Sequence, residues 1–131
     1  MARISIISLA FFLVSTCVLQ AQIAGVPNDS VAFSIKMAQL EQMDEMVLEN
    51  PIMAVGKSFL GMPYVEKTLE IGETESLIIN LKGFDCTTYV ENVLAFSLLL
   101  QNNGRQFENF AKNLETIRYR NGELNGYPSR L

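Results

Sequence analysis

Apolar side chains recur every three or four residues over four stretches of this chain, the spacing of one face of an α-helix. A cluster of Asn, Asp and Ser at 28–30 supplies an N-cap before the first stretch. Asn50 and Pro51 end that stretch and begin the second, since Asn caps helices well and Pro suits the first helical position. The pattern predicts helices over 30–49, 51–61, 86–103 and 107–117.

The predicted helix that starts at Cys86 differs from the others because apolar residues surround it almost completely. Tyr89, Val93 and Phe96 lie along one side, and residues such as Leu98 fill the other. A helix that is apolar all round is buried between layers. We therefore expect this helix at the centre of the fold.

Signals for β-structure are sparse. Residues 76–81 have the composition of a strand or an extended arm, with 65–71 as a candidate partner. The pair Asn121-Gly122 is typical of a two-residue hairpin turn. One strand and the beginning of a hairpin would leave the central helix uncovered. We therefore expect this chain to be incomplete.

The first residues indicate export. The stretch between Arg3 and Gln20 is apolar and uncharged, and it leads into small residues. This is typical of a secretory signal peptide, here cleaved after Ala21 or Ala24, and it predicts a periplasmic protein with no membrane span after cleavage. A retained anchor is a weaker alternative, because the stretch is short for a bilayer. Acylation of Cys17 is also weaker, since lipoprotein signals prefer Gly or Ala before the cysteine.

Composition narrows the function. The chain has 131 residues, enough for one domain, and 10 Lys and Arg against 14 Asp and Glu give a net charge of −4. No basic run is present, which argues against a nucleic-acid partner. The chain has no histidine, and Glu91 and Asn92 have no partner set for Zn²⁺, so we expect neither a metal nor a cofactor.

Cys86 is the only cysteine left once the signal peptide is removed. It follows Asp85, a natural N-cap, and takes the first position of the predicted central helix, where first-turn amides and the helix dipole stabilise a thiolate. Position alone leaves two interpretations open: a packed structural thiol and a nucleophile. Asp85 could cap the helix, face a substrate pocket, or do both.

Two motifs, V-G-K-S-F-L-G-M-P-Y-V at 55–65 and F-D-C-T-T-Y-V-E-N-V at 84–93, together resemble the NlpC family of papain-like bacterial cell-wall cysteine peptidases. The extended segment L-I-I-N-L at 77–81 and the final I-R-Y-R-N-G-E-L-N-G-Y-P-S-R-L favour the N-acetylmuramoyl-L-alanine amidase-like branch. The resemblance extends from Ile52 to Leu131. It implies an α+β, papain-like NlpC-type fold, of which this chain, as an N-terminal fragment, holds mainly the helical N-terminal half and lacks the C-terminal antiparallel sheet. The expected domains are a signal peptide at 1–21, an N-terminal helical segment at 22–50 and an incomplete amidase domain at 51–131.

The resemblance also implies a chemistry. Cys86 would be the nucleophile that cleaves the bond between muramic acid and L-Ala in muropeptides, with Tyr64 beside it and Asp85 at the substrate end of the helix. A packing role for Tyr64 is the alternative from the residues alone. Because the histidine base of the family is absent here, this chain is expected to be inactive by itself, with the base in the missing sheet. A stem-peptide endopeptidase cutting after D-Glu and a non-catalytic exported helical module stay open, and so does the oligomeric state.

Overall fold

The computed structural model describes residues 29–43, 47 and 49–131. The predicted signal peptide, its expected cleavage sites and Cys17 lie outside this part of the chain. The described elements are α1 (Asp29–Glu41), α3 (Pro51–Ser58), α4 (Cys86–Gln101) and α5 (Phe107–Arg118), followed by the short 3-10 turns η1 (Arg120–Gly122) and η2 (Tyr127–Ser129). Within this part, no helix is long and apolar enough to cross a bilayer.

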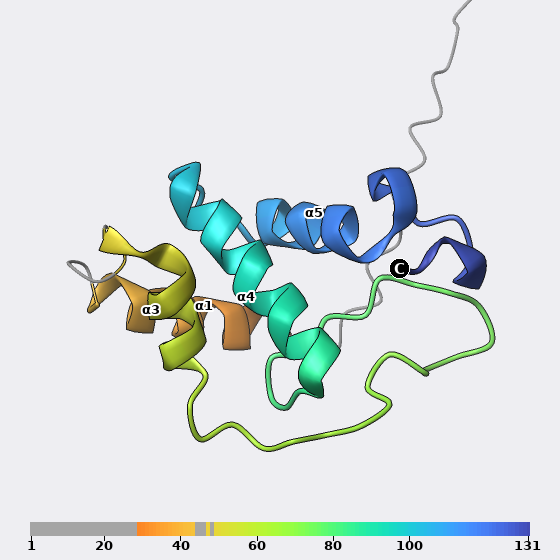
Figure 1. The fold of residues 1–131 in the computed structure, drawn as a ribbon, viewed down its shortest axis with the longest axis horizontal. Helices are drawn as coiled ribbons and strands as arrows, with labels where there is room; N and C mark the ends of the chain where they lie inside the picture. Colours follow the sequence, from red (N-terminus) through yellow and green to blue (C-terminus); the bar gives the residue numbers. More distant parts are fainter. Residues whose placement is uncertain (1–28, 44–46, 48) are drawn as a thin grey trace, which may run out of the picture.

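Helix α4 lies between α5 on one side and α3 with α1 on the other, while the segment 59–85 runs around one end of the bundle (Figure 1). Three phenylalanines join the helices. The rings of Phe33 in α1, Phe96 in α4 and Phe110 in α5 lie 4.3–5.6 Å apart between centroids, and all three side chains are buried. Aromatic pairs at this separation add to the stability gained from burial. The expectation of a central helix from 86 is therefore met.

The burial of α4 is less complete than its composition suggests. Val93 and Phe96 are buried, because α3, α1 and α5 cover that side. Val90, Leu94 and Leu98, spaced four residues apart on one row of the helix, are 37–52% exposed. The prediction of a helix buried all round is wrong for this row.

The first predicted helix is shorter than the sequence pattern indicates. Helix α1 ends at Glu41, and Gln42 and Met43 form a turn, so 30–49 is not one continuous helix. Leu40 is the last residue of α1 in the core, and the exposed Glu41 and Gln42 that follow it offer the core no apolar side chain. The next boundary is as predicted: Asn50 Oδ1 accepts a hydrogen bond from the Met53 amide at 3.1 Å, and Pro51 begins α3.

The segment 76–81 is an extended arm. Its apolar side chains are buried, including Leu77, Ile79 and Leu81, but among the described residues it forms no ladder with 65–71. Its backbone is held in another way: Arg118 Nη1 donates to Ile78 O at 2.6 Å. Of the two alternatives, the extended arm is confirmed and pairing with 65–71 is wrong.

A buried ion pair joins α4 to α5. Arg118 Nε and Nη2 lie 2.9 and 2.8 Å from Glu91 Oε2, and both residues are buried. A guanidinium fork suits this arrangement because it can serve a carboxylate and a carbonyl together. Arg118 is therefore a residue of the interior. The Glu91 carboxylate thus has its partner on the neighbouring helix α5.

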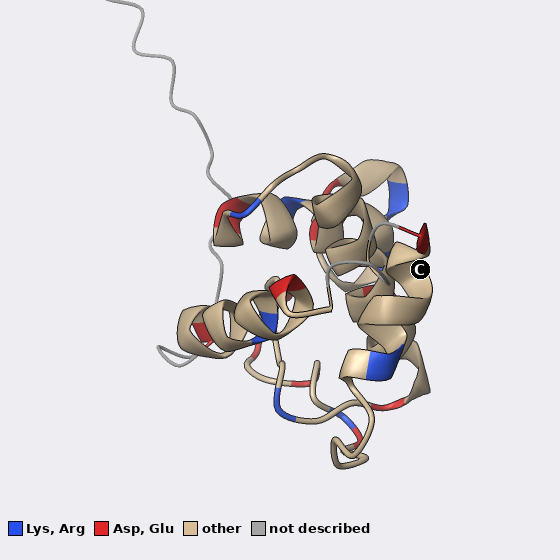
Figure 2. Ribbon diagram, turned by 90° about the vertical axis from the view of Figure 1, so that its left-hand side faces the viewer, with Lys and Arg blue, Asp and Glu red and all other residues tan. Residues whose placement is uncertain are grey.

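A second polar cluster fixes the end of the chain. Arg130 binds Glu75 through both carboxylate oxygens at 2.7 Å, and the Tyr119 hydroxyl donates to the same carboxylate at 2.7 Å. Tyr119 and Arg130 also form an antiparallel bridge. Asn121 and Gly122 have positive φ of 59° and 69°, as the expected turn requires, although no hairpin ladder follows in the described residues. Elsewhere, acidic and basic residues are interspersed over the elements, as Figure 2 shows.

Candidate active site

Cys86 stands at the head of α4, and its side chain is exposed and free of any disulfide. The start of the helix is fixed by a capping box. Asp85 Oδ1 accepts from the Thr88 amide at 2.8 Å, and Thr88 Oγ1 accepts from the Asp85 amide at 3.0 Å. Reciprocal bonds of this kind satisfy two of the amides that a helix leaves unpaired. The capping role of Asp85 is thus observed, and it holds Cys86 at the first helical position.

Tyr64 is brought next to this helix start by backbone pairing. Val65 N donates to Phe84 O at 3.0 Å, and Phe84 N donates to Pro63 O at 3.1 Å, so Tyr64 and Phe84 form a parallel bridge. The approach is close at Gly83, where a Cβ would lie 2.5 Å from Val65 Cγ2. A side chain at this position would force Val65 to move. The two motifs of the sequence are therefore in direct contact.

A cavity of about 340 Å³ opens between these motifs. Tyr64, Asp85 and Cys86 line it together, and Phe59 and Phe84, packed edge to face at 4.9 Å, form part of its wall. The Tyr64 side chain is 67% exposed. The structure thus assembles all three residues that the sequence singles out, and Tyr64 is not a core packing residue.

The pKa values of Asp85 and Tyr64, the two titratable residues beside the thiol, are shifted in opposite directions. Partial burial works to raise the pKa of Asp85, but hydrogen bonds from Thr88 and from the Thr87 amide outweigh it, and the pKa is lowered. The pKa of Tyr64 is raised, by desolvation and by the negative charges of Glu66, Cys86 and Asp85. Asp85 is therefore ionised and Tyr64 protonated at neutral pH, which leaves the Tyr64 hydroxyl as a donor in the cavity.

Among the residues that the structure describes, none that lines the Cys86 cavity is a histidine or a lysine that could act as its base. The chain has no histidine, and no lysine lines the cavity. Lys36 is buried and satisfied: it donates to Ser58 O at 2.6 Å and to Gln39 Oε1 at 2.8 Å, and its Nζ lies 4.2 Å from the centre of the Phe59 ring. In the part of the chain that the structure describes, no group of three or more potential metal ligands comes together.

Sequence reasoning missed the role of Thr88. The signal was available, since a hydroxyl three residues after an N-cap Asp can complete a capping box. It also missed the Glu75 cluster, because Glu75, Tyr119 and Arg130 are far apart in sequence and no local pattern joins them.

The helix α4 is capped at its start and presents an exposed thiol to a cavity. This arrangement is typical of proteins with a cysteine-centred active site. The family model described as AmiA-like, N-acetylmuramoyl-L-alanine amidase-like, matches residues 54–131. This chain belongs to that family. The match covers both motifs and every residue placed in the cavity.

Several solved structures are similar to this chain in sequence and fold. An N-acetylmuramoyl-L-alanine amidase from Bacteroides uniformis is 44% identical, with a TM-score of 0.58 over 62% of this chain and 34% of its own. A Bacteroides fragilis protein with a provisional xylanase name is 50% identical, with a TM-score of 0.54 over 58% of this chain and 33% of its own. Protein LPG0564 from Legionella pneumophila, of family DUF1460, is 25% identical, with a TM-score of 0.58 over 77% of this chain and 33% of its own.

This chain therefore spans about a third of the length of the solved relatives that it matches. No curated protein matches it significantly.

Proposed function

We propose that this chain carries the nucleophile of an exported cysteine amidase that cleaves the bond between N-acetylmuramic acid and L-Ala in muropeptides. The observation that carries the proposal is the placement of Cys86, exposed at the capped start of α4 and inside a cavity with Tyr64. Membership of the amidase-like family supports the bond. The name of the Bacteroides uniformis relative supports it too.

The proposed reaction has two steps. The Cys86 thiolate attacks the lactyl carbonyl carbon, and the tetrahedral intermediate collapses as the C–N bond breaks, leaving a thioester on sulfur. A general acid protonates the departing L-Ala nitrogen. Water then attacks the thioester, which releases the muramic acid carboxylate and regenerates the thiol. The backbone amide of Cys86 is suited to stabilise the oxyanion in both steps, because at the first helical position it has no helix carbonyl four residues back, whereas the Thr87 and Thr88 amides are bonded to Asp85.

The base is proposed to be a histidine outside these residues. The chain has none, and a thiol amidase needs a group that takes the thiol proton and returns it to the leaving amine. We place this histidine in the antiparallel sheet of a papain-like, NlpC-type fold. Export through the N-terminal signal belongs to the same proposal, and it predicts a secreted product whose N-terminal sequence begins at Gln22.

Glycoside hydrolysis, which the name of the Bacteroides fragilis relative suggests, fits the site less well. Glycosidases require two carboxyl groups that flank the scissile bond. Asp85 is the only carboxyl residue among those lining the Cys86 cavity, and its Oδ1 is committed to the Thr88 amide and hydroxyl. The cavity instead presents the exposed Cys86 thiol, a side chain suited to nucleophilic attack, beside the Tyr64 hydroxyl.

The experiment uses a chimera in which residues 54–131 replace the matched third of the Bacteroides uniformis amidase. We expect the chimera to release an intact stem peptide headed by L-Ala from a soluble muropeptide. Cys86→Ala in the chimera should abolish turnover and keep substrate binding, since sulfur forms the covalent bond and adds little to recognition. Arg120→Ala, exposed in the turn η1, is the control.

Mass spectrometry of the products separates the alternatives. Free muramic acid sugar plus an intact stem peptide supports the amidase. A sugar that still bears L-Ala and D-Glu supports the endopeptidase. Turnover by Cys86→Ala would contradict the proposal, and an inactive but folded chimera with bound muropeptide would favour a non-catalytic binding module.

A further inference from the structure

A hollow of about 340 Å³ opens where the loop 69–76 lies against residues 127–130. The loop supplies Ile71 and Glu73 to its lining, and the C-terminal segment supplies Tyr127 and Arg130. We call this feature the Tyr127 hollow. Its lining residues are all different from those of the Cys86 cavity, and its volume lies at the lower end of the range that holds small ligands.

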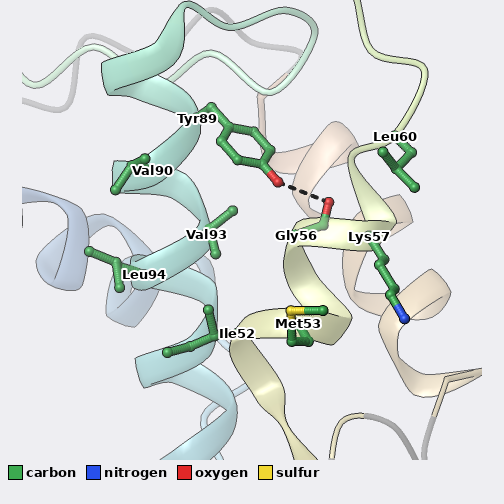
Figure 3. Close-up of a pocket in the computed structure, with 9 residues that line it drawn as sticks. All are labelled: Ile52, Met53, Gly56, Lys57, Leu60, Tyr89, Val90, Val93 and Leu94. Atoms are coloured by element: carbon green, nitrogen blue, oxygen red, sulfur yellow. Dashed lines mark hydrogen bonds between the residues drawn. The ribbon is translucent and has the colours of Figure 1, made fainter.

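A larger hollow of about 380 Å³ between α3 and α4 has a different character (Figure 3). Apolar side chains such as Met53 and Val90 line it, and Lys57 points away from α4. The Tyr89 hydroxyl donates to Gly56 O at 3.2 Å, within the protein. This larger hollow therefore offers a polar ligand few partners, whereas charged, hydroxyl and aromatic side chains line the Tyr127 hollow.

The ring of Tyr127 is open to solvent and lies in a hydrogen-bonded turn. The residue is 69% exposed. Ser129 Oγ accepts from the Asn125 amide at 3.0 Å and donates to Gly126 O at 2.7 Å. The guanidinium carbon of Arg130 lies 5.0 Å from the ring centre. An exposed aromatic ring in a hollow offers a surface on which the apolar face of a ligand can stack.

Arg130 supplies hydrogen-bond donors next to that ring. Its Nε and Nη2 bind the Glu75 carboxylate, and Nη2 also lies 3.4 Å from Leu69 O. A guanidinium has five N–H donors, and among the described residues no acceptor engages Nη1 of Arg130. Because its side chain is 19% exposed, Arg130 can donate to a ligand in the hollow.

The hollow carries charges of both signs. Glu70 and Glu73 are exposed on the loop, and Arg130 is the cation. Arg130 disfavours an ammonium ligand, and the two glutamates disfavour a carboxylate ligand. A neutral ligand avoids both repulsions, and its hydroxyl groups can accept from a guanidinium and donate to a carboxylate. Together with the ring for stacking, these groups favour a neutral ring that carries several hydroxyls.

We propose that the Tyr127 hollow binds a neutral pyranose ring of the cell-wall glycan, an N-acetylhexosamine, away from the bond that Cys86 cleaves. The apolar face of the sugar stacks on Tyr127, its oxygens accept from Arg130, and its hydroxyls donate to Glu73. The choice of a cell-wall sugar rests on the proposed function, whereas the preference for a neutral sugar comes from the hollow itself.

The chain connects this hollow to the Cys86 cavity over a short distance. Tyr64 lines the cavity, and Leu69, five positions later, lines the hollow. Five residues of fully extended chain span at most about 18 Å, a distance that an oligosaccharide of several rings covers. A glycan can therefore contact both sites at once, and the hollow acts as a second anchor for such a substrate.

The first test is the binding of the neutral trisaccharide of N-acetylglucosamine to this chain, measured by isothermal titration calorimetry. We expect a Kd of about 1 mM. Tyr127→Ala should raise the Kd at least about tenfold because stacking is lost, while Tyr127→Phe, which keeps the ring, should stay within about twofold. Tyr64→Ala, at a tyrosine of similar exposure (67%) in the Cys86 cavity, should not raise it.

Charged trisaccharides test the selection by charge. The glucosamine trimer, with ammonium groups, and the galacturonate trimer, with carboxylates, should each bind at least about tenfold more weakly than the neutral sugar. Glu73→Gln, which keeps the shape of an exposed side chain, should weaken neutral binding about threefold and gives a second variant if Tyr127→Ala does not fold.

Several results would overturn the proposal. One is a Kd above about 10 mM for the neutral trisaccharide, and another is an unchanged Kd in both Tyr127→Ala and Glu73→Gln. Tighter binding of the glucosamine trimer would identify an ammonium site instead. Loss of binding with Tyr64→Ala alone would place the sugar in the Cys86 cavity, against this proposal but in accord with the proposed function.

The chimera with the Bacteroides uniformis amidase, which contains residues 54–131, gives a second readout. Tyr127→Ala should raise KM for a disaccharide muropeptide about tenfold and keep kcat within about twofold, because the sugar contact is the same in the ground state and the transition state. Arg120→Ala is the control, and an unchanged KM in Tyr127→Ala would contradict the proposal. Cys86→Ala should leave trisaccharide binding by this chain unchanged, so sugar binding without turnover would count against the chemistry alone.

Discussion

At the scale of single residues, the phenol of Tyr119 shows how this chain uses buried polar groups. Its side chain is 1% exposed, and its hydroxyl donates to Glu75. Burial and the neighbouring Glu75 carboxylate raise the pKa of Tyr119 to about 12. Since the unfolded chain would lose this proton near pH 10, the bond adds stability that is complete below that pH.

The pH dependence of unfolding tests this account of Tyr119. Between pH 10 and pH 12 the unfolded state loses the proton while the folded state keeps it, so the Tyr119 contribution to stability should fall as the pH rises through this window. Tyr119→Phe should be less stable at pH 8 and should show a flatter decline above pH 10. The measurement is Tm against pH for both proteins. An unchanged slope in the variant would contradict the assignment.

Asp85 acts at the same scale on the start of α4. Asp85→Ala removes the acceptor for the Thr88 amide and should lower the free energy of unfolding by about 1 kcal/mol. Asp85→Asn, which keeps an acceptor oxygen, should lose less. Because the folded pKa lies below the ordinary 3.8, the carboxylate contribution is present above about pH 4 and is lost as the pH falls further. Urea unfolding at pH 7 and pH 3 measures both effects, and equal losses for the two variants would rule out capping.

At the scale of elements, the buried Arg118 holds α4, α5 and the extended segment together. Its guanidinium reaches Glu91 on α4 and the carbonyl of Ile78 in one arrangement. Removing one partner of a buried ion pair leaves the other charge without compensation. The position of α4, and with it that of Cys86, therefore depends on a contact remote from the thiol.

Arg118→Ala should lower the free energy of unfolding by about 3–5 kcal/mol, because it leaves the Glu91 carboxylate buried and unpaired. Arg120→Ala, two residues away and exposed, should change it by less than about 0.5 kcal/mol. Chemical denaturation of the two variants beside the wild type gives both values. A loss at Arg118 no larger than that at Arg120 would show that the pair adds nothing.

The elements also show what sequence patterns can predict here. Caps and periodicity gave the starts of α3 and α4, because Asn50 and Asp85 act through local hydrogen bonds. They did not predict the end of α1, which follows Leu40, the last residue of that helix in the core. They also did not predict the contacts of Arg118, because its partners Glu91 and Ile78 are distant in sequence. Burial and long-range pairing depend on tertiary packing, which local spacing does not contain.

At the scale of the whole molecule, the described residues divide into a packed interior and one open side. The phenylalanines of α1, α4 and α5 make a closed core, whereas Val90, Leu94 and Leu98 of α4 face outward. The sequence predicted a central helix that this chain alone would not fully cover. The uncovered part is the row of Val90, Leu94 and Leu98, whereas Val93 and Phe96 are buried.

The candidate site was the most predictable part of the molecule. Tyr64, Asp85 and Cys86 were singled out from two motifs, and the structure places them around one cavity. The Tyr64–Phe84 bridge that joins those motifs could not be predicted, because it forms between segments without strand periodicity. The chemistry itself stays a prediction, since a cavity and a thiol do not by themselves specify which bond is cut.

The central claim is that Cys86 becomes covalently bonded to the muramic acid side of its substrate, and trapping that intermediate tests it most directly. The chimera with the Bacteroides uniformis amidase is mixed with a soluble muropeptide, quenched in acid within the first turnover and digested. We predict that the peptide containing Cys86 gains the mass of the N-acetylmuramoyl group, as a thioester that hydroxylamine removes, while the free stem peptide appears in equal amount. Stem peptide released with no adduct on Cys86, or an adduct that carries L-Ala, would contradict the account.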